Sequence, residues 1–209
     1  MAAKIKKSKK PAKTSKAVKA KPVKQSAVAA KGGKLMKPAA APRKSAAAKG
    51  GSSSPDLSGM PAPAFTLTDQ DGNPVSLASL TANGNLVLYF YPKDMTPGCT
   101  TEACSFRDNL GEVRALGAQV VGVSADSTGS HQKFIAKQAL NFPLLSDPGN
   151  TVTKAYGVYK MKSLYGREFM GIERTTFIIG RDGVVKRIFP KVKVNGHTEE
   201  VLAALRQLG

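Results

Sequence analysis

Apolar runs and amphipathic stretches alternate along the chain from residue 56 onward. The run NLVLYFYP at 85–92 is apolar and aromatic almost throughout, which is typical of a central strand buried on both faces. The runs AQVVGVSAD at 118–126 and FPLLSD at 142–147 predict two further strands. RTTFIIG at 174–180 and GVVKRIFP at 183–190 flank the turn signal RDG, and this pattern predicts a hairpin.

The segments between these strands have the spacing of helices. In 100–116 apolar residues recur every three or four positions, and charged residues fill the other face. The segment 127–140 begins with Ser and Thr, which are preferred N-caps, and 150–158 predicts a short helix. A final amphipathic helix is predicted at 197–208. Because strands and helices alternate, the sequence predicts a layered α/β domain.

Residues 1–55 differ from the rest of the chain in composition and charge. They contain 16 Lys or Arg and no Asp or Glu, whereas the remainder balances 16 basic residues against 14 acidic ones. Such a segment cannot bury enough apolar surface to offset the entropy of an ordered chain. We therefore predict a disordered Lys/Ala/Pro-rich basic tail at 1–55, followed by one compact domain at 56–209.

The sequence also gives signals about the compartment. It has no run of about 18 or more apolar residues, and its N-terminus lacks the apolar stretch of a secretory signal. We therefore expect an intracellular, cytoplasmic protein without a membrane span. In a reducing compartment, the two cysteines are more often catalytic, metal-binding or incidental than a structural disulfide.

Both cysteines, Cys99 and Cys104, lie in the segment MTPGCTTEACSFRD. A short loop separates the strand that ends at Pro92 from the helix, so Cys99 is expected at or near the first helical turn. There the unpaired backbone N–H groups and the helix dipole favour an anion, and the thiolate is the nucleophilic form of cysteine. Free cysteines are often buried core residues, but the small and polar neighbours, Thr96 among them, favour a reactive thiol.

The spacing of the two cysteines limits how they can interact. Five residues of an ideal helix advance ~7.5 Å and rotate ~500°, which leaves the two thiols ~140° apart around the axis. The Cα atoms of Cys99 and Cys104 are then beyond the ~7 Å that a disulfide tolerates. A disulfide between them requires the first turns of the helix to unwind. The residues alone leave open whether Cys104 reacts or is a helix residue without a role.

Two other uses of cysteine do not fit this spacing. The two histidines, His131 and His197, lie at least 27 residues beyond Cys104, and C-x4-C is not the usual spacing of zinc ligands. A dithiol oxidoreductase would need C-x-x-C, which the sequence lacks. We therefore predict no metal and no cofactor. His131 and His197 have no constellation of polar residues around them in sequence, and we predict surface or helix-cap positions for both.

The segment FYPKDMTPGCTTEACSFRD resembles the active-site segment of the peroxiredoxins, in particular the peroxiredoxin Q or bacterioferritin comigratory protein branch. The downstream segments SHQKFIAKQALNFPLLSD, YGREFMGIERTTFIIG and DGVVKRIF are similar to that branch in the same order. The P-x3-T-x2-C pattern of Pro92, Thr96 and Cys99 is accompanied by a matching distal arginine, Arg174. The resemblance implies a thioredoxin-like fold, with a central mixed sheet flanked by helices, over 56–209.

The resemblance also implies a role for each matching residue. Cys99 matches the peroxidatic cysteine, which attacks a hydroperoxide and becomes a sulfenic acid. Cys104 matches the resolving cysteine on the same helix. Thr96 matches the threonine whose hydroxyl contacts the thiolate and the peroxide, and Pro92 matches the proline that covers the pocket. Arg174 matches the guanidinium that holds both the thiolate and the peroxide.

The implied activity is that of a thiol peroxidase for hydrogen peroxide and organic hydroperoxides. Glu102 lies in the same motif and is expected to orient Arg174. The resemblance implies an intrasubunit disulfide between Cys99 and Cys104, which thioredoxin or glutaredoxin reopens. Such a cycle needs no partner subunit, so we expect a monomer.

The basic tail leaves a second function open. Its composition resembles the tails of linker histones and bacterial histone-like proteins, and a flexible array of 16 cations would bind DNA nonspecifically. This contact would place the protein at a nucleoid or in a nucleus, whereas a targeting or solubilising extension would explain the same composition. The alternative function is a DNA-associated redox sensor in which Cys99 passes oxidation to a partner protein. An enzyme turns over many times, and a sensor does not.

Overall fold

The computed structural model describes residues 56–164 and 166–208, and the predicted tail at 1–55 lies outside them. The described residues form nine strands and six helices. In chain order these elements are β1 (Thr66–Asp69), β2 (Pro74–Ser76), α1 (Leu77–Thr81), β3 (Asn85–Phe90), α2 (Pro97–Asp108), α3 (Leu110–Ala115), β4 (Ala118–Ser124), α4 (Thr128–Gln138), β5 (Leu144–Ser146), α5 (Thr151–Ala155), β6 (Tyr159–Leu164), β7 (Arg167–Ile172), β8 (Thr175–Ile179), β9 (Val185–Phe189) and α6 (His197–Arg206).

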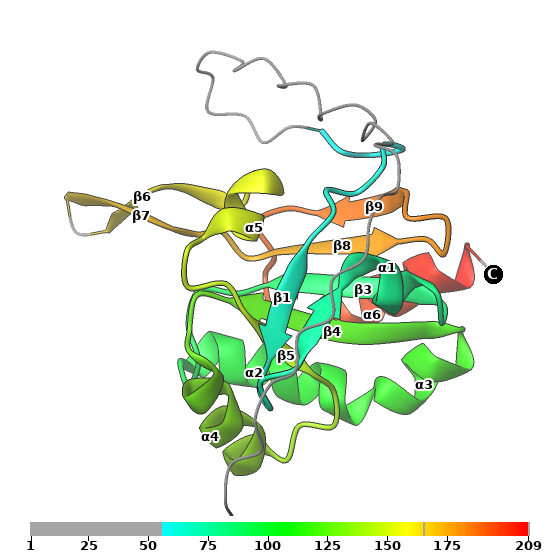
Figure 1. Cartoon of the computed structure of the whole chain (residues 1–209), viewed down its shortest axis with the longest axis horizontal. Helices are drawn as coiled ribbons and strands as arrows, with labels where there is room; N and C mark the ends of the chain where they lie inside the picture. The colour runs from blue at the N-terminus through cyan, green and yellow to red at the C-terminus, as the bar shows by residue number, and fades with distance from the viewer. Residues whose placement is uncertain (1–55, 165, 209) are drawn as a thin grey trace, which may run out of the picture. The chain divides into compact units, whose positions relative to one another are not determined.

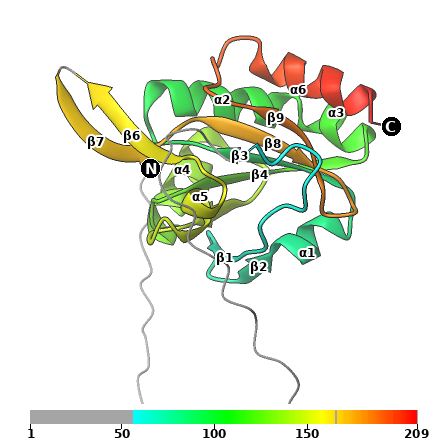
Figure 2. The same ribbon diagram turned by 90° about the horizontal axis from the view of Figure 1, so that it is seen from above.

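Seven of the strands form one mixed sheet in the order β2-β1-β5-β4-β3-β8-β9. Strands β3, β4 and β5 are parallel, and β8 runs antiparallel to β3. Helices cover both faces of this sheet, with α2, α3 and α6 on one side and α1 on the other (Figure 1 and Figure 2). The structure therefore confirms the predicted α/β class and the central mixed sheet.

The central strand β3 separates two apolar cores. Val87 and Tyr89 pack with α2, α3, α4 and α6, whereas Leu86 and Leu88 pack with α1 and α5. Successive side chains of a strand point to opposite faces of the sheet, so a strand that is covered on both faces is apolar at every position. This explains the continuous apolar run that predicted the strand.

One predicted helix is wrong in its bounds. The segment 100–116 forms two helices, α2 and α3, which are separated at Asn109. The side chain of Asn109 donates a hydrogen bond from Nδ2 to the carbonyl of Ser105 at 2.9 Å, and its backbone lies at φ −100° and ψ 7°. Asparagine competes in this way with the backbone ladder of a helix, and here it ends α2. The first helix also starts earlier, at Pro97, because proline suits the first helical position.

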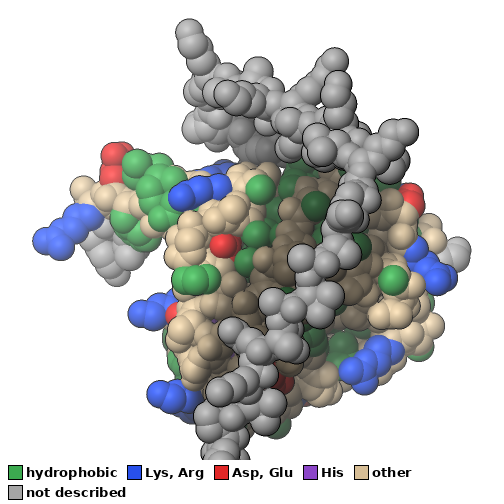
Figure 3. All heavy atoms as spheres, in the orientation of Figure 1, with side chains coloured by type: hydrophobic (Ala, Val, Ile, Leu, Met, Phe, Trp, Pro, Cys, Tyr) green, Lys and Arg blue, Asp and Glu red, His purple; other side chains and the backbone are tan. Residues whose placement is uncertain are grey.

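A separate two-stranded hairpin, β6–β7, projects from the domain beside the sheet (Figure 1). The sequence patterns did not predict it, nor did they predict β1, β2 and α1. Its side chains Met161, Phe169 and Met170 are exposed, and hydrophobic side chains are visible on it in Figure 3. Most of β7 is exposed, and a strand that is largely exposed on both faces lacks the alternation of apolar and polar residues that identifies a strand in sequence.

Both histidines are buried, so the prediction of surface or helix-cap positions is wrong. His197 opens α6, and its Nε2 lies 2.8 Å from the hydroxyl oxygen of Thr176 on β8. Its ring packs edge-on against Phe106 and Phe189, with centroids 5.9 and 5.4 Å away. Burial lowers the pKa of His197 from its ordinary 6.5 to about 4. The neighbours that bury it come from distant parts of the chain, and no local pattern reveals them.

We expect His197 to make the stability of the domain depend on pH. Its pKa is lowered on folding, so between pH 6.5 and about pH 4 the unfolded chain takes up a proton that the folded protein excludes. As the pH is lowered through this window, the free energy of unfolding should therefore decrease, and His197 should contribute up to about 3 kcal/mol of this decrease. Urea denaturation across the window should show a smaller decrease for His197→Gln. Other groups titrate equally in the wild type and in His197→Gln, so the difference between the two proteins reports on His197. If the free energy of unfolding decreased by the same amount in both, the prediction would be wrong.

Candidate active site

Cys99 lies in the first turn of α2, as the sequence predicts. Thr96 is the N-cap residue and Pro97 the first helical residue, so Cys99 is the third residue of the helix. Its side chain is buried, with 1% exposed. The first N–H groups of a helix lack intrahelical acceptors and form the positive end of the helix dipole. They therefore favour a negative charge on the sulfur of Cys99.

Arg174 approaches the same sulfur from the start of β8. Its Nη2 donates a hydrogen bond to Sγ of Cys99 at 3.2 Å, and its Nη1 donates to Oε2 of Glu102. Glu102 lies three residues after Cys99 on α2, so the two side chains emerge from the same face of the helix. One guanidinium thus bridges the candidate nucleophile and a carboxylate. Residues separated by about 70 positions in sequence meet here.

The pair of Glu102 and Arg174 is buried, and burial dominates its electrostatics. Burial raises the pKa of Glu102 to about 7, although the charge of Arg174 lowers it. Burial opposes the charge of Arg174, but Glu102 and Cys99 outweigh this and raise its pKa above the ordinary value. Arg174 therefore stays charged, whereas Glu102 changes its charge near neutral pH. Glu173, the neighbour of Arg174 in sequence, does not pair with Arg174. Its carboxylate instead binds Nζ of Lys160 at 2.6 Å.

Thr96 and Pro92 lie in and before the loop that leads into α2. The hydroxyl of Thr96 donates to the carbonyl of Lys93 at 3.1 Å, and the side chain does not cap the helix. Pro92 is exposed and lies two residues after the end of β3. The structure thus places both residues next to the start of the helix, but it brings neither into hydrogen-bond contact with Cys99. The roles that the family resemblance implies for them stay predictions.

Cys104 lies further along the same helix and is half-buried. Its Sγ lies 3.6 Å from Oε1 of Gln138 at the end of α4. Cys99 and Cys104 are both free thiols, and α2 is continuous between them. Because the helix separates them in this way, a disulfide between them requires part of α2 to unwind.

Sequence reasoning missed two buried polar residues next to the site. Asp94 lies in the loop before α2, and Nδ1 of His131 lies 3.0 Å from its carboxylate. The predictions left out Asp94 and gave His131 a surface or helix-cap position. The one signal for Asp94 was its position between a buried strand and a candidate nucleophile. For His131 the sequence offered no signal, because its partner is 37 residues away.

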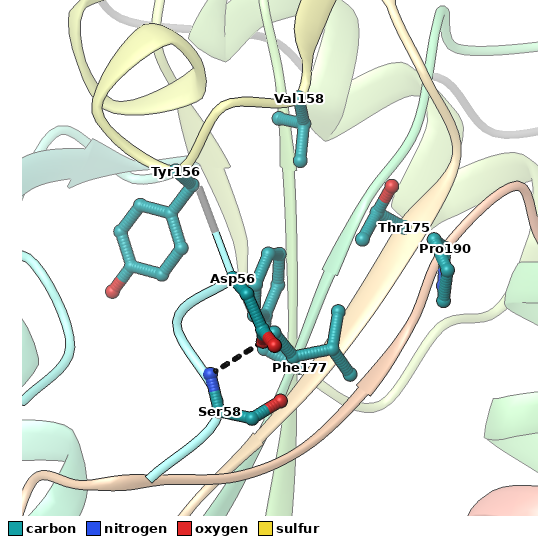
Figure 4. Close-up of a pocket in the computed structure, with 8 residues that line it drawn as sticks. Asp56, Ser58, Tyr156, Val158, Thr175, Phe177 and Pro190 are labelled. Atoms are coloured by element: carbon teal, nitrogen blue, oxygen red, sulfur yellow. Dashed lines mark hydrogen bonds between the residues drawn. The ribbon is translucent and has the colours of Figure 1, made fainter. Parts of the chain in front are cut away.

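A cavity of about 360 Å³ lies away from this site (Figure 4). Cys99 belongs to the core on one face of the sheet, whereas Phe177, which lines the cavity, belongs to the core on the other face. The polar contact that Figure 4 marks is local, from the backbone N–H of Ser58 to Asp56 at 3.0 Å. We assign no chemistry to the cavity. Its lining residues are Asp56, Ser58, Tyr156, Val158, Thr175, Phe177, Ile188 and Pro190.

The described part of the chain holds neither a cluster of metal ligands nor a membrane-spanning helix. Among residues 56–164 and 166–208, no group of three or more His, Cys, Asp or Glu side chains is arranged to hold a metal ion. Within the same residues, every helix is too short or too polar to cross a bilayer.

Comparisons with known proteins agree with this geometry. The profile of the AhpC/TSA family matches residues 58–188. Peroxiredoxin Bcp of Bacillus subtilis is 45% identical over 150 residues, which cover 72% of this chain and 95% of that protein. Peroxiredoxin Bcp of Escherichia coli is 42% identical over 154 residues, which cover 74% of this chain and 98% of that protein.

Solved structures give the same result. The bacterioferritin comigratory protein of Xanthomonas campestris superposes with a TM-score of 0.66 at 44% identity, over 69% of this chain and 91% of that one. The peroxidoxin BcpB of Mycobacterium tuberculosis also reaches 0.66, at 38% identity, over 73% of this chain and 98% of that one. The chain therefore belongs to the AhpC/TSA family and is a peroxiredoxin of the Bcp or peroxiredoxin Q type, a thiol peroxidase with a thioredoxin-like fold.

Proposed function

We propose that this peroxiredoxin reduces hydrogen peroxide and organic hydroperoxides with Cys99, and that Cys104 resolves the oxidised Cys99 through a Cys99–Cys104 disulfide, which an external dithiol then reduces. The observation that carries the proposal is the hydrogen bond of 3.2 Å from Arg174 to Sγ of Cys99 in the first turn of α2. Sequence resemblance supports the same assignment. The related structure from Xanthomonas campestris concerns alkyl peroxide reduction, which supports organic hydroperoxides as substrates here.

In the first step, the thiolate of Cys99 attacks one oxygen of R–O–O–H and the O–O bond breaks. The sulfur is oxidised to a sulfenic acid, and the departing RO⁻ takes a proton from solvent to leave as ROH. Negative charge develops on the departing oxygen, and donors that already point at the sulfur can stabilise it. Arg174 and the N–H groups of α2 supply such donors. In this proposal the hydroxyl of Thr96 contacts the peroxide, and Pro92 covers the pocket and excludes water.

In the second step, the thiol of Cys104 attacks the sulfur of the sulfenic acid and water leaves. The product is the Cys99–Cys104 disulfide, so the first turns of α2 have to unwind. A dithiol protein of the thioredoxin or glutaredoxin type then reopens the disulfide by exchange. Both cysteines belong to one helix, so the cycle can run in a monomer.

Variants of the two cysteines test the cycle. Cys99→Ser removes the nucleophile, and we expect steady-state peroxide consumption to fall by at least roughly 10³-fold. Cys104→Ser should still consume about one equivalent of peroxide, because the sulfenic acid of Cys99 forms. Without Cys104 the disulfide that thioredoxin reduces cannot form, so turnover should stop there. The measurement couples peroxide consumption to thioredoxin, thioredoxin reductase and NADPH.

The same measurement distinguishes an enzyme from a redox sensor. Sustained turnover by the wild-type protein supports the peroxidase. A single stoichiometric oxidation of Cys99 without turnover would contradict it and favour the sensor that passes oxidation to a partner protein.

The carboxylate of Glu102 should give the peroxide reaction a pH dependence of its own. Glu102 has a pKa of about 7, and only its ionised form binds Arg174 as an ion pair. As pH falls through 7, Glu102 becomes protonated and the guanidinium loses this support, so the second-order rate with peroxide should fall. Glu102→Gln keeps the shape but cannot titrate. Other ionising groups act in both proteins, so the stopped-flow rate should fall less between pH 9 and pH 5 in this variant than in the wild type, and equal falls would contradict the assignment.

We further propose that the basic segment 1–55 contacts DNA without sequence preference, which would associate the protein with a nucleoid or nucleus. Its 16 basic and no acidic residues favour this function. Neutralising phosphates with lysine releases counterions, so the contact should weaken steeply with salt.

Retention on immobilised DNA tests this contact. At low salt the full chain should be retained, and a chain that starts at Asp56 should not. Rising salt should release the full chain. Equal behaviour of the two chains would show that the segment does not bind DNA and would leave targeting or solubility as its role.

A further inference from the structure

A buried carboxylate, Asp94, lies in the loop between β3 and α2. Its side chain is almost completely buried, with 4% exposed. It accepts hydrogen bonds from the hydroxyl of Tyr91 at 2.7 Å and from the hydroxyl of Ser130 at 2.6 Å, and Nδ1 of His131 lies 3.0 Å away. A carboxylate taken out of water needs such partners. We name Asp94, Tyr91, Ser130 and His131 together the Asp94 anchor.

The anchor ties the loop to rigid parts of the domain. Tyr91 follows β3 directly, and its ring stacks on Tyr89 with centroids 5.4 Å apart. Ser130 and His131 belong to the first turns of α4. The backbone N–H of Asp94 also donates to Asp126 at 2.8 Å, just after β4. The loop is therefore held by contacts just after β4 and at the start of α4. It is also held by Tyr91, directly after the preceding strand β3.

The electrostatics of Asp94 agree with a charged anchor. Burial raises the pKa of Asp94, but the hydrogen bonds from His131, Ser130 and Tyr91 outweigh burial and hold the pKa below its ordinary value. Asp94 is therefore a carboxylate at neutral pH. Its charge also lies beside the N-terminal end of α4, where a helix favours an anion.

His131 is placed for this contact. Its ring is completely buried, and its Nε2 has no hydrogen-bond partner among residues 56–164 and 166–208. A buried polar atom without a partner costs about 1–3 kcal/mol, and such atoms are uncommon in folded proteins. An apolar side chain could fill this volume without that cost. An apolar side chain could not make the contact between Nδ1 and Asp94, so this contact accounts for a histidine at position 131.

The chain from Asp94 to Cys99 has little freedom to absorb a shift. Met95 has a left-handed backbone with φ +60°, which non-glycine residues rarely adopt, and Thr96 is extended at φ −79° and ψ 150°. The ring of Pro97 fixes the next φ. A displacement of Asp94 would therefore move the start of α2 and the sulfur of Cys99 with it. The backbone of Arg174 leads into β8 and does not move with the loop, so a shift of about 1 Å at the helix start would lengthen or misalign the hydrogen bond to the sulfur.

We propose that Asp94, held by Tyr91, Ser130 and His131, is a positioning residue that keeps the sulfur of Cys99 within hydrogen-bond reach of Arg174 during the peroxide step. This inference rests on the proposed function of Cys99. Asp94 acts through the loop and the helix start, and it does not itself touch the reacting atoms.

Two reactions of the same thiol test the inference. In the full chain carrying Cys104→Ser, Asp94→Asn and His131→Leu should each lower the second-order rate of Cys99 with hydrogen peroxide by roughly 10- to 100-fold, because that step needs Arg174 in place. Alkylation of Cys99 by iodoacetamide needs no such alignment once the thiol is ionised, so both rates are measured at a pH where they no longer rise with pH. Its rate should stay the same or rise, because the buried thiol becomes more accessible.

Two milder variants separate the contact from general damage. His131→Asn places an amide nitrogen near the position of Nδ1 and should largely restore the peroxide rate that His131→Leu loses. Tyr91→Phe removes one hydroxyl of the anchor and should lower the rate only a few-fold. If His131→Asn and His131→Leu behave alike, the contact with Asp94 does not position Cys99.

Asp147→Asn is the matched control. Asp147 is also a buried aspartate in a loop before a helix, and it accepts from the backbone N–H groups of Thr151 and Thr153, both at 2.9 Å. It lies before α5, whose residues pack on the other face of the sheet, so its loss should change stability but neither rate. Peroxide rates of folded Asp94→Asn that equal the wild type, or an equal loss in both reactions, would overturn the inference. A wild-type protein inert to peroxide would instead overturn the proposed function and the inference with it.

Discussion

The geometry of the site depends on the buried ion pair between Arg174 and Glu102. Two buried charges lose their hydration, and only close geometry between them compensates for this loss. Removing either partner would leave the other charge buried without compensation, which is commonly worth about 3–5 kcal/mol. The pair joins the start of β8 to the first turns of α2, and the free end of the guanidinium then reaches Cys99. The contact that holds the helix to the sheet thus also directs the guanidinium toward Cys99.

The contacts of α2 differ between its two halves. The first turns are held to the domain by the polar contacts of Cys99 and Glu102 with Arg174 and by the packing of Cys99 in the core. The later turns are held by packing and by further bonds, with Phe106 fully buried, Ser105 bonded to Thr198, and Arg107 bonded to the carbonyl of Gln138. Polar contacts exchange readily with water, whereas apolar packing does not. In the proposed cycle, opening would therefore begin at the N-terminal end of α2 and bring Cys99 toward Cys104.

The parts of the fold that follow from local pattern could be predicted from the sequence. The strand β3, the capped helix α4 and the hairpin of β8 and β9 each carry a period or turn signal of their own. Cys99 was placed correctly because a strand, a short loop and a helix start are all local features. The break at Asn109 and the burial of His131 and His197 depend on contacts that the pattern does not encode. Arg174 was predicted as a site residue only from the family resemblance, since no spacing rule connects it to a cysteine 75 positions earlier.

Cys99 is both a core residue and the candidate nucleophile, and this combination affects each step of the cycle. With only 1% of Cys99 exposed, its sulfur is out of reach of another protein in this conformation. A dithiol reductant must reach a sulfur to exchange with it, so it cannot act while α2 is intact. In the proposed cycle, the disulfide forms only after the helix has opened, which exposes both sulfurs together. Unwinding would therefore do two things at once: it permits the Cys99–Cys104 bond, and it makes the oxidised protein, not the reduced one, the form that the reductant can attack.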